Sequence, residues 1–495
     1  MNIVVIGAGF GGIATAIRLQ AHGHQVTLID KRDKLGGRAY VYELEGFKFD
    51  AGPTIITAPW LIEELFDVSG KPMQNYVKLV QLNPFYNIRF EDGSVFHYNN
   101  DSDYLIEQIR AFNPVDVAGY ERFYQASQAV FNKGLPLMTK PFGKITDMVK
   151  VAPDMVELQS FKSVAGFVNQ YIQDERLRQV FSFHPLLIGG NPFQSTSIYA
   201  MIHKLEQAFG IWFAMGGTGA LVEGLGRLFI DIGGKVLLNT EVTEIVIDAK
   251  TKRATGVNTS NHGYIGAEAV VSNADVAFTY LNLIPAKYRR KWSDKRIKSL
   301  RYSMSLFVLY FGTNRQYEHM AHHEILMGKR YRDWIEDIFT RKYLPDDFSL
   351  YLHRPTATDT SLAPSGCDCF YVLAPVPHLG ADVDWKTTAK PFRDRIVKYL
   401  EEKYLPDLSQ HIVTEHYIDP LHFRDSLNSY LGSAFSIEPT LFQSAYFRPH
   451  NQSEDISNLY FVGAGTHPGA GIPGVLSSSK IVAQMIPPTP LNKGG

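Results

Sequence analysis

The hydrophobic pattern of the first thirty residues predicts a strand, a glycine-rich turn, a helix and a second strand. Val4, Val5 and Ile6 form a short β-branched run without charge, which is typical of a strand buried on both faces. Residues 7–12 are rich in glycine, and the helix that follows them leads into "QVTLID", a second strand that ends in Asp30. This order of elements predicts an α/β protein.

The rest of the chain combines this α/β pattern with a helical segment and a largely antiparallel sheet. Alternating residues in "YVYELEGFKFD" predict a hairpin at 40–50. Apolar residues spaced by three and four predict helices from about residue 100 to 178, including one that begins at a cap-like Ser102. Further predicted elements are a helix at 220–232, strands at 235–239, 242–247 and 267–276, strands at 305–312, 348–353 and 370–376, a helix at 392–404, and a strand, glycine loop and helix at 458–486.

The order of these segments predicts a discontinuous nucleotide domain. Residues 300–445 are expected to form a domain of their own, in which helices accompany a sheet. After that domain the chain returns to a strand, a glycine loop and a helix, as at its N-terminus. The two ends of the chain are therefore expected to belong to one domain.

The glycine-rich turn fits the dinucleotide-binding pattern G-x-G-x-x-G at Gly7, Gly9 and Gly12. In this pattern the first glycine permits the tight bend, the second lets the backbone approach a pyrophosphate, and the third lets the helix lie close to the strand. Asp30 lies 18 residues after Gly12, where an acid accepts hydrogen bonds from a ribose 2′-hydroxyl. Because an acid would repel a 2′-phosphate, we expect FAD or NAD and not NADP.

The same glycine pattern also occurs at residues 469–474, so the pattern alone is weak. There it follows "GTHP", whereas the first copy has strand, turn, helix, strand and acid in order. That context favours a dinucleotide site over a structural glycine turn in some other α/β protein.

Charge and cysteine content narrow the possible partners. The 495-residue chain carries 49 Lys and Arg against 50 Asp and Glu, so it has no basic excess for binding nucleic acid. Cys367 and Cys369 are expected to be free thiols in a reducing compartment. Since the first strand begins beside Met1 and no run of about 20 apolar residues occurs, we expect a cytoplasmic protein whose membrane contact is peripheral and mainly hydrophobic.

The stretch from Val180 to Val222 is unusually poor in charge. Its 43 residues include only Lys204 and Glu206 as charged residues, where the chain average of 20% would give about nine. Glycines and prolines break it too often for a transmembrane helix. Two interpretations fit equally well: ordinary core and buried loop, or an apolar channel for a water-insoluble ligand.

Other kinds of active site find little support. "HMAHH" supplies His319, His322 and His323, but no acid completes a familiar metal-ligand set, so no metal site is expected. "GGTGA" lacks the Lys-Ser/Thr of a phosphate-binding loop, and no G-x-S-x-G occurs. A redox cofactor that brings its own chemistry remains. With one well-placed fingerprint, a nicotinamide domain is not expected, so a diffusible acceptor such as oxygen or a quinone is expected to receive the electrons.

The chain as a whole resembles the bacterial-type phytoene desaturases, a family of carotenoid desaturases. The motifs that carry the resemblance run from end to end: "GAGFGG", "DKLGGRAYVYELEGFKFDAGPTIIT", "FSFHPLLIGGNPF", "MGGTGALVEGL", "SNADV", "YVLAPVPHLG" and "NLYFVGAGTHPGAGIPGV". The last motif is far more specific than the glycine pattern. The family shares its flavin fold with amine oxidases and glutathione-reductase-like enzymes.

The resemblance implies an FAD-dependent oxidoreductase that removes hydrogen from CH–CH bonds of phytoene, in four steps to lycopene. It implies no particular catalytic residue, since flavin or solvent can take the proton. A related isomerase or saturase, a desaturase with fewer steps or a shorter C30 substrate, and a non-catalytic carotenoid or flavin carrier are the alternatives.

The resemblance also implies a role for individual residues. Gly7, Gly9 and Gly12 would face the pyrophosphate, and Asp30, where many relatives carry Glu, would face the adenosine ribose. The remaining implied cofactor residues are Gly36, Gly37 and Arg38 at the diphosphate, Val242 at the adenine, Gly465 and Thr466 at the ribityl and phosphate groups, and Pro53, Thr54 and the helix start Ile472, Pro473, Gly474 and Val475 at the flavin ring.

Three regions are implied in the same way. A Rossmann-like FAD-binding domain would comprise 1–80, 216–290 and 450–487, and a mixed-sheet substrate domain would comprise 81–105 and 291–449. Residues 106–215 would form a helical region that associates with the membrane, where phytoene dissolves.

Overall fold

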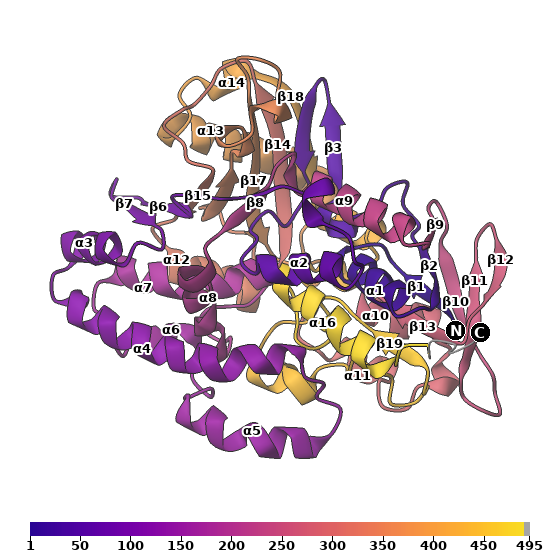
Figure 1. Ribbon diagram of the computed structural model, residues 1–495. Coiled ribbons are helices and arrows are strands. Elements are labelled where there is room, and N and C mark those ends of the chain that lie inside the picture. The colour runs from indigo at the N-terminus through magenta and orange to yellow at the C-terminus, as the bar shows by residue number, and fades with distance from the viewer. Residues whose placement is uncertain (490–495) are drawn as a thin grey trace.

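The computed structural model describes residues 1–489 and confirms the α/β class (Figure 1). A five-stranded sheet, in which every neighbouring pair is parallel, has the order β19–β13–β1–β2–β9. Its strands are β1 Asn2–Ile6, β2 Gln25–Ile29, β9 Lys235–Leu237, β13 Ala269–Ser272 and β19 Leu459–Phe461. Neighbours in this sheet therefore come from the beginning, the middle and the end of the chain.

Helices from equally distant parts of the chain cover this sheet. The glycine-rich turn leads into α1, which lies against α9 and α16, and Figure 1 shows the C-terminal α16 running beside the N-terminal helix. These helices are α1 Phe10–Ala21, α2 Pro59–Asp67, α9 Gly217–Asp231 and α16 Ile472–Met485. Helices α1 and α16 therefore lie side by side although they come from the two ends of the chain.

A small antiparallel sheet and several short helices flank the parallel sheet. The sheet has the order β10–β11–β12, and a separate two-stranded pair joins β5 to β8. The strands are β10 Val242–Ile247, β11 Ala254–Thr259, β12 Gly263–Gly266, β5 Leu79–Gln81 and β8 Trp212–Ala214, and the short helices are α10 Val276–Phe278 and α11 Asp294–Lys298.

The predicted second sheet has seven strands in the order β18–β14–β17–β16–β15–β6–β7. All pairs are antiparallel except β15 with β6. Its strands are β6 Tyr86–Phe90, β7 Val95–Tyr98, β14 Ser305–Thr313, β15 His323–Met327, β16 Leu350–His353, β17 Asp368–Val376 and β18 Ile412–Ile418. The predicted hairpin is also present, as β3 Val41–Leu44 and β4 Phe47–Asp50.

Strand β14 is buried along its whole length because both faces of this sheet are covered. Phe307, Leu309 and Phe311 pack with α13 on one face, while Leu306 and Val308 point to the opposite face and the main core. This is the period of two that a pleated strand imposes. The helices of this part are α12 Tyr331–Glu336, α13 Trp385–Lys403, α14 Leu408–His411 and α15 Pro420–Asp425.

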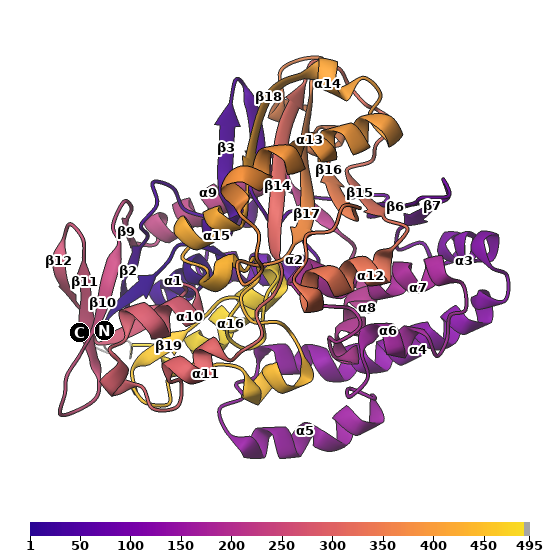
Figure 2. The ribbon, with the colours of Figure 1, turned by 180° about the vertical axis from the view of Figure 1, so that it is seen from behind.

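The helices of residues 102–209 lie next to one another on one side of the molecule (Figure 2). They are α3 Ser102–Phe112, α4 Asp116–Gly134, α5 Ile145–Glu157, α6 Val164–Val168, α7 Glu175–Ser182 and α8 Met201–Phe209. One detail of the prediction was wrong: Asp101, not Ser102, caps α3, because its carboxylate accepts hydrogen bonds from the amides of Asp103 and Tyr104. Among the described residues, no helix is long and apolar enough to cross a membrane.

Candidate functional site

One large cavity of about 540 Å³ runs from the glycine-rich turn to the helical segment. Its size is within the range of small-molecule sites. Of the residues singled out in the sequence, those on its wall are Gly7, Gly9, Asp30, Gly36, Gly37, Arg38, Pro53, Thr54, Val242, Ile472, Pro473, Gly474 and Val475. Gly12, Gly465 and Thr466 do not line it.

The glycine-rich turn has the backbone that its sequence predicted. Gly7 has a φ of +89°, which favours glycine. A Cβ on Gly12 would overlap the carbonyl oxygen of Gly7, so Gly12 permits the close approach of helix to strand. The N-terminus of α1, beginning after Gly9, has neither a side-chain cap nor an acid in its first turn. Its amides are therefore available to an anion.

Asp30 at the end of β2 holds the turn in place. One carboxylate oxygen accepts a hydrogen bond from the amide of Ala8 at 2.6 Å, and the other accepts from the amide of Arg32 at 2.8 Å. Burial raises the pKa of Asp30, and these two hydrogen bonds oppose the shift. Because a carboxylate has about four lone-pair positions, Asp30 can still accept from a ribose on the cavity side.

The Gly36–Arg38 segment forms the next part of the wall. Gly36 and Gly37 have φ values of +116° and +58°, and a Cβ on Gly37 would lie 3.2 Å from the Cα of Gly9. The two glycine segments therefore touch. Nη2 of Arg38 donates to Oγ of Ser429 at 2.6 Å, while Nε has no partner. Burial lowers the pKa of Arg38, and the nearby Asp275 opposes that shift.

A second helix N-terminus faces the same cavity. Helix α16 begins after Gly471, with Pro473 in its first turn, and it has no side-chain cap and no acid there. A Cβ on Gly474 would overlap the carbonyl oxygen of Gly469, so this turn needs its glycine.

Thr466 and Gly465 pack behind this wall. The hydroxyl of Thr466 donates to the carbonyl oxygen of Pro449, and Gly465 packs against Val276. Gly463, Ala464 and His467 line the cavity in this loop instead.

These features fit a dinucleotide cofactor. Two uncapped helix N-termini on one cavity provide amides and positive dipole ends for anionic groups. On the same wall, Asp30 supplies a hydrogen-bond acceptor and Arg38 supplies a cation with an unpartnered N–H.

The far part of the cavity is apolar. From the charge-poor stretch, its wall includes Phe183, Leu186, Leu187, Ile188, Ile198, Tyr199, Met201, Ile202 and Leu205. Both interpretations of that stretch therefore apply to part of it, because other residues in it, such as Phe181 and Phe213, lie in the main core and not on the cavity wall. Glu206 also lies on this wall although it is completely buried, and no motif in the sequence marked it as a site residue. Its only warning sign was that it is one of two charges in 43 residues.

Asn273 and Asp275 were also missed as site residues, although they fall in the quoted motif "SNADV". Nδ2 of Asn273 donates to the carbonyl oxygen of Gly7, and both residues line the cavity. Their position depends on β13 pairing with β1, which no local pattern reveals.

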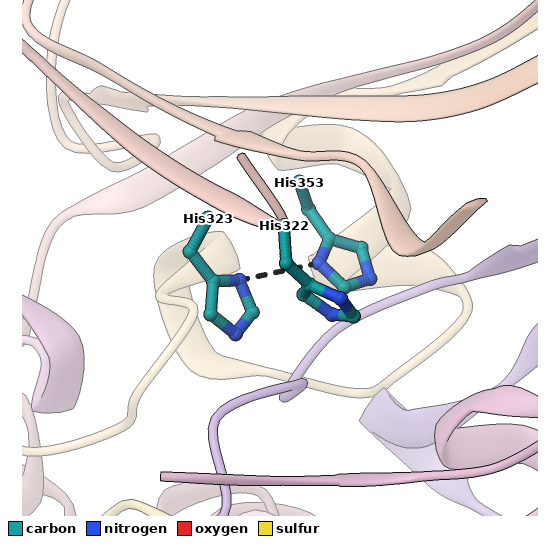
Figure 3. Close-up of side chains that lie close together, drawn as sticks. All are labelled: His322, His323 and His353. Atoms are coloured by element: carbon teal, nitrogen blue, oxygen red, sulfur yellow. Dashed lines mark hydrogen bonds between the residues drawn. The ribbon is translucent and has the colours of Figure 1, made fainter. Parts of the chain in front are cut away.

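Three buried histidines, His322, His323 and His353, lie close together (Figure 3). The structure joins His322 and His323 of the "HMAHH" segment to His353, and not to His319, because β15 pairs with β16. The Nδ1 atoms of His323 and His353 are 3.3 Å apart, and His323 Nδ1 is 2.7 Å from the hydroxyl of Tyr351. The cluster offers three nitrogens with no thiolate or carboxylate among them, whereas a closed zinc site uses four ligands.

Comparison with known proteins identifies the family. A family model for flavin-containing amine oxidoreductases matches residues 10–487. A lycopene-forming phytoene desaturase of Pantoea ananas is 52% identical over 484 residues, covering 97% of this chain and 98% of the relative. A second lycopene-forming phytoene desaturase, of Pseudescherichia vulneris, is 53% identical over 488 residues, covering 98% of each chain. The chain belongs to the phytoene desaturases, within the flavin-containing amine oxidoreductases.

The fold of this phytoene desaturase family member agrees with solved structures. A putrescine oxidase bound to putrescine superposes with a TM-score of 0.66 at 12% identity and covers 98% of this chain and 99% of that chain. At that identity the likeness concerns the fold alone. The family makes the protein an FAD-dependent oxidoreductase.

Proposed function

We propose that this protein desaturates phytoene in four successive FAD-dependent steps and releases lycopene. The observation that carries the proposal is that one cavity joins the cofactor cradle to an apolar wall. Its lycopene-forming relatives, similar over nearly their whole length, support the product.

The glycine-rich turn, Asp30 and Arg38 would hold FAD, which would supply the acceptor for a hydride. The protein's own residues contribute by holding the substrate in place and by excluding water. Phytoene has no polar groups, so hydrogen bonds cannot hold it, and the apolar wall binds it by shape and excludes water. The uncapped N-terminus of α16, which faces the same cavity, would favour negative charge that develops on the flavin ring. Since one dinucleotide fingerprint is present, oxygen or a quinone is the proposed electron acceptor.

A pigment profile tests this function. We expect a bacterium that accumulates phytoene to form lycopene when it expresses this chain. Unchanged phytoene would contradict the proposal. A saturated or isomerised product would indicate the related saturase or isomerase, and a partly desaturated end product would indicate fewer steps. Supplying a C30 substrate in a parallel strain shows whether the shorter chain is preferred.

Helix α5 supports the further proposal that the protein binds the membrane surface. One side of α5 lines the cavity through Met148, Val151 and Met155. Its other side exposes Ile145, Val149 and Val156 to solvent, although these are apolar. Figures 1 and 2 show α5 at the edge of the molecule, away from both sheets. A helix that presents apolar residues both to solvent and to the cavity suits the entry of a lipid-soluble substrate.

Charge substitutions on α5 are expected to release the protein from membranes. Val149 and Val156 are 66% and 68% exposed, and Val149→Glu with Val156→Glu should abolish flotation with liposomes. Ile230→Glu on α9, at a residue 56% exposed, is the matched control and should still float. The wild type should float even at about 1 M salt, where the Debye length is ~3 Å. Release by salt alone, or equal flotation of all variants, would contradict a hydrophobic attachment through α5.

A further inference from the structure

Glu206 is a carboxylate on the wall of an apolar cavity. It lies in α8 beside Ile202 and Leu205, which also line the cavity, and its side chain is completely buried. Burying a charge costs several kcal/mol unless hydrogen bonds or a counter-charge compensate. A polyene without polar groups gains nothing from a carboxylate as a binding partner. Another reason for its position is therefore needed.

Two buried side chains hold this carboxylate. The hydroxyl of Tyr86 on β6 donates to Oε1 at 2.6 Å, and Nε2 of His184 lies 3.1 Å from Oε2. Burial raises the pKa of Tyr86 well above its ordinary value, with Glu206 adding to the shift, so the hydroxyl remains a donor. With one partner on each oxygen, further lone pairs remain free on the cavity side.

No lysine or arginine neutralises Glu206 among residues 1–489. Its one salt-bridge partner there is His184. Lys204, two residues away in α8, instead donates to the hydroxyl of Tyr124. The carboxylate is thus oriented by hydrogen bonds and is not quenched by a fixed cation, as a proton acceptor must be.

His184 also connects Glu206 to the cofactor end of the cavity. It begins the short 3-10 segment His184–Ile188, and Ile188 lies against the start of α16, where a Cβ on Gly471 would be 3.2 Å from its Cγ2 atom. The wall that carries Glu206 is therefore continuous with the helix N-terminus that faces the flavin position.

We propose that Glu206, oriented by Tyr86 and His184, is the acceptor of the proton that leaves the polyene during desaturation. This rests on the proposed function. One C–H bond breaks and its hydride, with two electrons, goes to FAD. The C–H bond on the adjacent carbon breaks, its electron pair forms the new double bond, and the proton passes to a carboxylate oxygen of Glu206. The same carboxylate stabilises the positive charge that develops on carbon as the hydride leaves.

Glu206→Gln tests this with little disturbance, because the amide oxygen can still accept from Tyr86 and the amide N–H can donate to Nε2 of His184 in the other tautomer of the imidazole. We expect unchanged FAD affinity and an unchanged Tm. Under anaerobic conditions, bleaching of the flavin by phytoene should slow by about 100-fold or more, and Glu206→Asp should recover part of the rate. Glu223→Gln, at an exposed position on α9, is the matched control and should behave as wild type.

Infrared difference spectra provide a readout that does not depend on rate. On adding phytoene anaerobically, the wild type should gain the band of a protonated carboxyl, and Glu206→Gln should lack it. Wild-type bleaching in Glu206→Gln would overturn the role of Glu206, and so would a slow variant that has also lost FAD or stability. Failure of the wild type itself to bleach would instead overturn the proposed function, and with it the role of Glu206.

Discussion

Gly12→Ala is expected to yield a protein that does not retain FAD. The added methyl would overlap the carbonyl oxygen of Gly7, which is backbone of the same turn and cannot rotate away. Helix α1 would have to move off β1, which displaces the amides at its N-terminus from the pyrophosphate position. We expect a loss of about 3 kcal/mol in the free energy of unfolding, at the upper end of overpacking effects, and FAD affinity at least about tenfold weaker, the factor that corresponds to 1.4 kcal/mol.

Gly143→Ala is the matched control for that substitution. Gly143 has open space around the position of a Cβ and no positive φ, so an alanine there should change neither quantity. FAD released by heat from a known amount of protein, together with Tm, measures both effects. A Gly12→Ala protein with full FAD content would show that the turn does not hold the cofactor.

Arg38→Met should also weaken FAD binding strongly, with less effect on folding. Its guanidinium lies on the cavity wall with an unpartnered Nε, and a charge-assisted hydrogen bond contributes about 1.5–3 kcal/mol. That corresponds to about 10- to 150-fold in affinity. The pKa of Asp275, which burial raises and Arg38 lowers, should rise further in the variant.

Arg424→Met is the control for Arg38→Met, since Arg424 is 52% exposed and pairs with Asp425. Flavin fluorescence on titration with FAD gives both affinities. Equal FAD affinities in the two variants would show that Arg38 does not contact the cofactor. A lower FAD affinity in Arg38→Met alone would show that it does.

The parts of the fold that depend on near neighbours in sequence were predictable. The strand, turn, helix and acid of residues 4–30 lie in one local unit, and their glycines have the conformations that the pattern requires. The β3–β4 hairpin and three strands of the second sheet, β14, β16 and β17, follow from alternation and apolar runs, whereas β6, β7, β15 and β18 were not predicted. The cap of α3 was misplaced by one residue because Asp101 and Ser102 are both good caps, and only the backbone geometry decides between them.

Sites assembled from distant segments were not predictable. Glu206 meets Tyr86 across 120 residues, and His353 meets His323 only because two strands pair. The resemblance put Thr466 beside the ribityl and phosphate groups; in the structure its hydroxyl donates to the carbonyl oxygen of Pro449 and it does not line the cavity. In each case the sequence shows the chemical type of the residue. The direction in which its side chain points depends on tertiary packing, which the local sequence pattern does not encode.

The most direct test of the central claim uses purified protein, FAD and phytoene in liposomes, without NAD(P)+. In air, or with a quinone, absorbance should move to longer wavelength as conjugation grows, and lycopene should accumulate. Without oxygen or quinone, product should stop at a single turnover per bound FAD. An absolute requirement for NAD(P)+, or phytoene that stays untouched while FAD is bound, would contradict the claim.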